Sequence, residues 1–265
     1  MQNFIISLAK NNSKRRDHMQ NEFEKQNINF EFFEAITPNF NTQLLQKYEL
    51  NEIQSELVDR EISCFLSHYV LWQKIVENNI KFAGIFEDDI FLGENAEIFL
   101  TNSDWIDSDI DIIKLEKGWQ KTIKTPFQAD KEFCSRALYK LQSAHYGAAG
   151  YIISNKGAKY LIKKYKELKK IEAIDVIIFE KLLKAKDYQV QQLLPAICVQ
   201  DFILHNGLYV NFESALEEDR AKKYSLHTVK KKTVWFKVKR EIAKPFISFF
   251  NFIYKRLFIK EVHFQ

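Results

Sequence analysis

Short apolar runs alternate with longer segments of helical periodicity through the first 200 residues. Compact apolar runs are typical of buried strands, whereas apolar residues three and four positions apart indicate amphipathic helices. The pattern predicts strands over residues 4–8, 30–36, 82–92, 111–115, 147–154 and 190–199. It predicts helices over residues 17–26, 41–58, 62–76, 156–170 and 176–184. Because strands that alternate with helices are typical of α/β domains, we expect one such domain with a mostly parallel central sheet.

The pattern changes after residue 219, so we divide the chain into a domain of residues 1–219 and a C-terminal tail of residues 220–265. The tail carries 13 Lys and Arg and two acidic residues, for a net charge of +11. Residues 1–219 carry 26 basic and 33 acidic side chains, for a net charge of −7. A helical wheel separates an apolar face from a basic and polar face, and the apolar face holds Ile242, Phe246, Phe249, Phe250, Ile253 and Leu257.

This tail favours an amphipathic helix that lies on an anionic membrane surface. A C-terminal helix that packs on the domain's own core is the alternative. Nucleic-acid binding is the weakest interpretation, because no reader module is recognisable and the rest of the chain is acidic, so we expect no nucleic-acid partner.

Composition excludes several classes of protein. The chain has 265 residues, of which 46% are hydrophobic and 28% charged, as in a globular protein and unlike a disordered, collagen-like or multi-span membrane chain. It contains neither a dinucleotide-binding glycine motif nor a P-loop. Three widely spaced cysteines, Cys64, Cys134 and Cys198, indicate no disulfide framework, so we expect a reducing compartment, cytosolic or peripheral to a membrane.

Three consecutive acids, Glu87, Asp88 and Asp89, are the most informative chemistry in the chain. Apolar residues 84–86 and 90–92 flank them on both sides, which places them at the end of a buried strand. Adjacent carboxylates repel one another, so burying them is costly without a cation. Two of them, at positions 87 and 89, share one face of a strand and suit a hard divalent cation. A solvated acidic turn is the alternative.

Several segments in order resemble glycosyltransferase family 25, the bacterial lipopolysaccharide and lipooligosaccharide glycosyltransferases that are related to collagen galactosyltransferases. The resemblance covers about residues 3–200. It rests on residues 5–8 with Arg15 and Arg16, on 32–35, 62–68 with Trp72, 85–90 and 111–115, and on 147–154 with 156–158. Two positions depart from the family's pattern: Ser63 stands where glycine is usual, and Ala148 where threonine is frequent.

The resemblance implies a GT-A-type nucleotide-sugar-binding fold, a divalent metal (Mn²⁺ or Mg²⁺) and an inverting transfer of a sugar, commonly galactose from UDP-galactose. It implies metal binding by Glu87 and Asp89 within the acidic motif that also contains Asp88. The family's first strand and basic pair imply that Ser7, Leu8, Arg15 and Arg16 lie near the nucleotide. Other matching positions in the family's motifs are Ser67, His68, Gly147, Tyr151 and Asp175.

Most of these residues also have an ordinary structural interpretation. Arg15 and Arg16 suit phosphate oxygens or a solvated helix flank, and His68 suits a ligand or a satisfied core position. Lys114 interrupts an apolar strand and needs an anionic partner, from the protein or from a bound diphosphate. Our candidate catalytic carboxylates are Asp88 and Asp175, although the latter would serve equally as a helix cap. Asp111 and Asp201 are the next candidates for a base, and Asp201 and His205 for completing a metal shell.

We therefore expect an inverting, metal-dependent glycosyltransferase whose substrates are a UDP-sugar donor and a lipid-linked oligosaccharide acceptor. Its basic tail would hold it on the inner face of the bacterial cytoplasmic membrane. Two alternatives remain open: a metal-dependent phosphoryl or nucleotidyl transferase that uses the same acids, and a non-catalytic membrane-associated scaffold.

Overall fold

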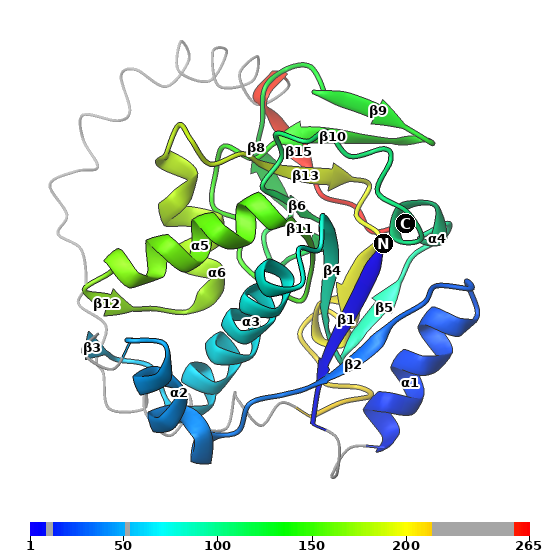
Figure 1. Cartoon of the computed structure of the whole chain (residues 1–265). Coiled ribbons are helices and arrows are strands. Elements are labelled where there is room, and N and C mark those ends of the chain that lie inside the picture. Colours follow the sequence, from blue (N-terminus) through cyan, green and yellow to red (C-terminus); the bar gives the residue numbers. More distant parts are fainter. Residues whose placement is uncertain (9–12, 51–53, 214–256) are drawn as a thin grey trace, which may run out of the picture.

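The computed structural model describes residues 1–8, 13–50, 54–213 and 257–265 (Figure 1). Within these residues the centre of the molecule is an eight-stranded sheet. In spatial order its strands are β2 (Glu31–Glu34), β1 (Gln2–Ser7), β4 (Phe82–Glu87), β11 (Gly150–Ser154), β6 (Ile112–Lys114), β13 (Val190–Leu194), β10 (Arg136–Lys140) and β9 (Lys131–Phe133). The prediction of an α/β fold is confirmed.

The prediction of a mostly parallel sheet is wrong, because the sheet is mixed. Of the seven strand pairings in the described sheet, only β1–β2, β1–β4 and β6–β13 are parallel. Strand β11 runs antiparallel between β4 and β6. All five of its residues are buried, so its sequence has the apolar character expected of a central parallel strand. The hydrophobic pattern reports burial on both faces and carries no information on direction.

Helices cover both faces of the sheet (Figure 1). Helices α3 (Asp59–Glu77) and α5 (Asn155–Glu167) pack on one face, and α1 (Ser13–Glu24) and α4 (Glu97–Leu100) on the other. Alternate strand residues divide between the two cores, so Phe4 and Ile6 join the first core while Ile5 joins the second. The result is a three-layer α/β/α arrangement.

Most predicted elements are present with shifted ends. The predicted helices over 17–26, 62–76 and 156–170 correspond to α1, α3 and α5. Of the described residues of the segment 41–58, those that are helical form α2 (Asn41–Lys47), which follows the 3-10 turn η1 (Pro38–Phe40). Residues 176–184 form short consecutive turns: α6 (Ile174–Val176), the π-helical turn η2 (Ile177–Lys181) and the 3-10 turn η3 (Leu182–Lys184).

Two predicted strands are each divided in two. The run over 82–92 becomes β4 and β5 (Ile90–Leu92), with Asp88 and Asp89 in the turn between them. The run over 190–199 becomes β13 and β14 (Cys198–Gln200), separated around Pro195, and a short helix α7 (Asp201–Leu204) follows directly. Strand β14 then pairs with β5 and with β7 (Glu116–Lys117) in a small second sheet.

The last residues of the chain belong to the domain. Strand β15 (Ile259–Glu261) pairs antiparallel with β8 (Thr122–Lys124), and the Val262 side chain is buried. The remaining described pair joins β3 (Gln54–Ser55) to β12 (Lys170–Ile171). The predicted amphipathic helix lies largely within residues 214–256, outside the described residues. Among the residues that are described, no helix has the length and apolar character needed to cross a bilayer.

Candidate functional site

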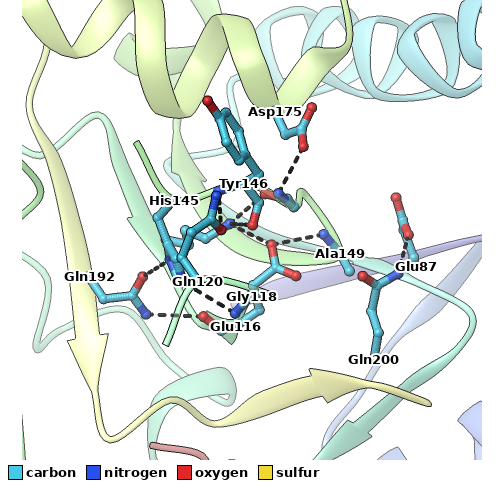
Figure 2. A network of polar contacts seen from close by, with 12 residues as sticks. Glu87, Glu116, Gly118, Gln120, His145, Tyr146, Ala149, Asp175, Gln192 and Gln200 are labelled. Carbon is cyan, nitrogen blue, oxygen red and sulfur yellow. Dashed lines mark hydrogen bonds and ion pairs between the residues drawn. The ribbon is translucent and has the colours of Figure 1, made fainter. Parts of the chain in front are cut away.

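The three consecutive acids lie at the carboxyl ends of the parallel strands. Glu87 is the last residue of β4, and Asp88 and Asp89 form the turn into β5. Gln200, at the end of β14, donates from its side-chain amide to Glu87 Oε2 at 3.0 Å and to Asp89 Oδ1 at 3.2 Å; Figure 2 shows its contact with Glu87. The side chains of Asp88 and Asp89 are 14% and 18% exposed. The acids are therefore largely buried and do not form the solvated turn considered as an alternative.

The acids line a cavity of about 530 Å³ at this edge of the sheet. It contains eight of the residues selected from the sequence: Ser7, Leu8, Arg15, Ser67, His68, Glu87, Asp88 and Asp89. Ligands of open α/β sheets bind outside the carboxyl ends of the strands, which is where these residues meet. A larger cavity of about 670 Å³ lies beside β9, β10 and β15, at the far edge of the sheet, and is lined by other residues.

The charge of the cavity is only partly balanced. Arg15 Nη1 lies 2.6 Å from Asp88 Oδ1 and 3.7 Å from Asp89 Oδ2, and its Nη2 donates to the Glu213 carbonyl. Burial alone would lower the pKa of Arg15, but the neighbouring Asp88 and Asp89 carboxylates raise it. Burial and the negative charge of Glu87 raise the pKa of Asp89 to about 7. The cavity lining holds Glu213 as well as these three acids, against Arg15 and Arg60, so acidic side chains are in surplus and the site favours a further cation.

His68 presents one unpartnered ring nitrogen at the cavity. Its Nδ1 lies 2.8 Å from the Tyr151 hydroxyl, and the Trp72 indole N–H donates to the same hydroxyl at 3.0 Å. Because that hydroxyl accepts from Trp72, we assign its proton to the bond with His68 Nδ1, which leaves the proton of the neutral ring on Nε2. Burial lowers the pKa of His68 to about 3, so the ring is neutral at pH 7.

Two buried polar atoms of cavity-lining residues indicate a polar ligand. His68 Nε2 and Ser7 Oγ both lack a hydrogen-bond partner among the described residues. The nearest anionic oxygen to His68 Nε2 is Glu87 Oε1, at 3.9 Å, beyond hydrogen-bond distance. Because leaving such groups unpaired is costly, both atoms suit contacts to a bound polar molecule.

Two sets of side chains could hold a metal, and Glu87 belongs to both. Glu87 and Asp89 share the Gln200 amide, so their oxygens converge on one point. Atoms of Cys64, His68 and Glu87 lie within 4.8 Å of one another. Hard cations such as Mn²⁺ and Mg²⁺ prefer carboxylate oxygens, whereas thiolate and imidazole suit Zn²⁺. The carboxylates of Glu87 and Asp89 therefore suit the predicted hard cation.

Two basic residues selected from the sequence lie outside the cavity. Arg16 stacks on Phe32 and pairs with Glu34 at 3.3 Å. Lys114 is fully buried and pairs with Glu116 at 2.7 Å. The partner of Lys114 is thus the protein itself, which decides between the two possibilities left open by the sequence.

Glu116 organises the loop that precedes β11. Its Oε1 accepts from the Ala149 N–H at 3.2 Å as well as from Lys114 (Figure 2). Gly147 has a φ of +103°, and a Cβ at this position would lie 2.9 Å from the Glu116 carboxylate oxygens. The Gly147 N–H donates to Asp175 at 2.9 Å, and the second oxygen of Asp175 accepts from the Val176 N–H. Gly147, Tyr151 and Asp175 are thus not among the residues that line the cavity, and Tyr151 is joined to it through its hydrogen bond with His68.

Three further sequence candidates have structural roles instead. Asp201 does not complete a metal shell, because its carboxylate accepts hydrogen bonds from the backbone N–H groups of residues 210–212. Burial opposes ionisation of Asp201, but these bonds and the Asn211 side chain lower its pKa. His205 pairs with Asp201 at 3.0 Å. Asp111 precedes β6, at the ends of the strands opposite to the three acids. It accepts a hydrogen bond from the Gln189 N–H at 2.7 Å.

Sequence reasoning missed several lining residues, among them Gln200, Phe202 and Tyr209. They approach the acids because β14 pairs with β5, a contact between segments about 110 positions apart. The only local signal is that Gln200 and Phe202 follow a predicted strand, where ligand-binding residues are common.

The chain resembles known glycosyltransferases. A family model described as glycosyltransferase family 25 (LPS biosynthesis protein) matches residues 1–178. A putative glycosyltransferase of Haemophilus influenzae is 41% identical over 252 residues, which cover 94% of this chain and 86% of that protein. The lipooligosaccharide biosynthesis protein lic2B of Haemophilus influenzae is 36% identical and covers 98% and 97%. The lacto-N-neotetraose biosynthesis glycosyltransferase LgtB of Neisseria meningitidis is 32% identical and covers 83% of each chain.

Proposed function

The chain belongs to glycosyltransferase family 25, and on this premise we propose that it transfers a sugar from a UDP-sugar to a lipooligosaccharide or lipopolysaccharide glycan. Galactose from UDP-galactose is the donor that we propose, as the sequence resemblance implies. One observation carries the proposal: the acids at the end of β4 and Arg15 line a single cavity with two polar atoms that have no partner among the described residues. These groups could bind a polar, anionic ligand together with a bridging cation.

The cavity residues divide by chemistry into a diphosphate part and a sugar or nucleoside part. Glu87 and Asp89 would hold Mn²⁺ or Mg²⁺, which neutralises charge on the leaving diphosphate when bound. Arg15 is positioned to contact a phosphate oxygen while it keeps its ion pair with Asp88. The His68 Nε2–H and the Ser7 hydroxyl would bond to hydroxyl or carbonyl groups of the donor. In this proposal the carboxyl ends of β1 and β4 bind the nucleotide-sugar, as in a GT-A-type fold.

An inverting transfer also needs a base for the acceptor hydroxyl. Of the two carboxylates selected for catalysis, Asp88 is held in its ion pair with Arg15. Asp175 is oriented by the Gly147 N–H in the loop that precedes β11, and its oxygens keep further lone pairs for an incoming hydroxyl. We therefore propose Asp175 as the base. An Asp175→Asn variant keeps the contact to only one of these two N–H groups, because its side-chain oxygen accepts and its amide NH2 does not. A fall in kcat with unchanged UDP affinity supports this role.

The direct test is UDP release from UDP-galactose, UDP-glucose and UDP-N-acetylglucosamine, with deacylated lipooligosaccharide as acceptor and with Mn²⁺, Mg²⁺ or EDTA. Transfer of one sugar, seen by mass spectrometry and lost in EDTA, supports the proposal. NMR of the product's anomeric proton distinguishes inversion from retention. Transfer of a phosphoryl or nucleotidyl group would support the first alternative function. UDP binding without any turnover would support the scaffold.

We also propose that residues 220–256 attach the enzyme to the cytoplasmic face of an anionic membrane, because this segment carries most of the tail's positive charge. The packing of Val262 and β15 means that removing the whole tail would damage the fold. The better test replaces lysines and arginines within residues 220–256 by glutamine and keeps residues 257–265. Flotation with phosphatidylglycerol vesicles should be lost at unchanged thermal stability. Retained flotation would contradict the attachment.

A further inference from the structure

A row of stacked aromatic rings leads away from the cavity. The Tyr209 ring stacks on Phe202 with centroids 4.6 Å apart, and Phe202 stacks on Trp119 with centroids 5.5 Å apart. Phe202 and Tyr209 line the cavity, whereas Trp119 lies at the outer end of the row and is 61% exposed. The indole is thus held flat against another ring on one side and is open to solvent on the other. The Trp119 ring is therefore an exposed surface next to the site of chemistry.

Buried polar groups fix the loop that carries Trp119. The Gly118 N–H donates to His145 Nε2 at 3.3 Å, and His145 Nδ1 donates to the Gln192 side-chain oxygen at 3.0 Å (Figure 2). Burial lowers the pKa of His145 to about 3, so its Nε2 remains an acceptor at pH 7. On the other side of the tryptophan, the Gln120 side-chain oxygen accepts from the Tyr146 N–H at 3.1 Å.

This network anchors both neighbours of Trp119 in the sequence. A Cβ on Gly118 would lie 2.5 Å from the Tyr146 carbonyl, so this close approach requires glycine. The loop is therefore held before any ligand arrives, and binding to Trp119 would cost little ordering of the chain.

We propose that Trp119 is a stacking subsite for a pyranose ring of the acceptor glycan. A pyranose presents an apolar C–H face, which suits an exposed indole, and a rim of hydroxyl groups, which needs polar neighbours. The Tyr146 hydroxyl, hydrogen-bonded to Glu180 at 2.9 Å, supplies such neighbours from the adjoining loop. Because Phe202 joins Trp119 to the cavity, a glycan stacked there would extend from the reacting sugar outward.

This inference rests on the proposed glycosyl transfer and adds where the acceptor binds. It assigns the acceptor to the Trp119 side of the acids. The nucleotide would then take the side of the cavity formed by Ser7, Leu8 and Ile36, at the ends of β1 and β2. Donor and acceptor thus contact different residues, and their affinities can be changed separately.

The test compares Trp119→Ala and Trp119→Tyr with a matched control, Phe127→Ala. Phe127 is 55% exposed and lies near Lys260 of the C-terminal strand. With deacylated Haemophilus influenzae lipooligosaccharide as acceptor, Trp119→Ala should raise the acceptor KM about tenfold, which is the loss of one good stacking contact. Trp119→Tyr should recover most of the affinity, and Phe127→Ala should match the wild type.

Two measurements separate this inference from the proposed function. Isothermal titration should give the same Kd for UDP in Trp119→Ala as in the wild type. Saturation-transfer NMR should show the oligosaccharide binding to the wild type and losing that signal in Trp119→Ala. An unchanged acceptor KM, or no oligosaccharide signal in the wild type, would overturn the subsite even if UDP-sugar hydrolysis persists. A weaker Kd for UDP would instead place the nucleobase on the stack, and lost vesicle flotation would assign the ring to the membrane; either result overturns the inference.

Discussion

Removing the Tyr151 hydroxyl should lower the free energy of unfolding more than removing most other single polar groups of this protein. It lies between the Trp72 indole N–H, at 3.0 Å, and His68 Nδ1, at 2.8 Å, and all three side chains are fully buried. Tyr151→Phe preserves the ring and nearly all of its volume. It leaves a buried donor on Trp72 and a buried acceptor on His68 without their shared partner.

The magnitude follows from these two groups. An unsatisfied buried donor or acceptor costs about 1–3 kcal/mol. Partial relaxation of two such groups gives an expected loss of about 2–4 kcal/mol in the free energy of unfolding. The chain offers a matched control in Tyr165→Phe. Tyr165 is also fully buried, but its hydroxyl has no partner among the described residues, so removing it should leave stability unchanged or slightly higher.

Urea unfolding at pH 7 measures the free energy of unfolding of both variants, and we expect their m-values to equal that of the wild type. Heteronuclear NMR of the histidine ring would also show whether His68 keeps its proton on Nε2, since the Tyr151 bond fixes this tautomer. Transfer activity should fall in Tyr151→Phe and not in Tyr165→Phe, because only the first disturbs a ring that lines the cavity. Equal stability losses in the two variants would refute the assignment of a Trp72–Tyr151–His68 hydrogen-bond chain.

Three other changes test separate parts of the structure. Asp89→Asn should reduce turnover by about 100-fold or more. Because the folded pKa of Asp89 is raised to about 7, its ionisation destabilises the fold as pH rises, so the same variant should unfold at higher urea at pH 8. The low folded pKa of His145 means that only the unfolded chain binds its proton between pH 6.5 and 3. Stability should therefore fall on acidification, and His145→Gln should flatten the slope by about 1.4 kcal/mol per pH unit below pH 6. Deleting residues 257–265 should lower unfolding free energy by at least about 2 kcal/mol, because it exposes the core around Val262; an unchanged thermal midpoint would contradict this packing.

The core of the site could be predicted because its signals are local. Three acids between apolar runs require a strand end, and Arg15 follows the first apolar strand. Parallel strands bring their carboxyl ends to one edge, so these two segments meet in space. The pairing of Arg15 with Asp88 is the physical result of that adjacency.

Other parts of the site had signals that the sequence left ambiguous. A lysine within an apolar strand indicates an anionic partner, which Glu116 supplies two positions further along the chain, yet a bound diphosphate satisfied the same pattern. Asp201 looked like a metal ligand because it follows a strand. Its actual partners are backbone N–H groups of residues 210–212, and a backbone turn leaves no side-chain pattern to detect.

The direction of β11 and the approach of Gln200 and Trp119 could not be predicted, because they depend on pairing between distant segments. A strand that is buried on both faces has the same composition in either direction. In the sequence, nothing distinguishes the amide of Gln200 or the ring of Trp119 from the same side chains on an ordinary protein surface. What gives them a place near the acids is the small sheet formed by β5, β14 and β7, whose strands come from three parts of the chain.

The sign of the charge explains why the cavity would require two kinds of ligand at once. Four lining residues are acidic (Glu87, Asp88, Asp89 and Glu213), and Arg15 and Arg60 are the basic lining residues described. A diphosphate brought alone into this surplus of negative charge would be repelled, whereas a bound cation would offset part of that charge. Each ligand lowers the cost of the other, so their binding should be positively coupled. The same surplus would oppose retention of the product diphosphate once its cation departs, which links release of the nucleotide to release of the metal.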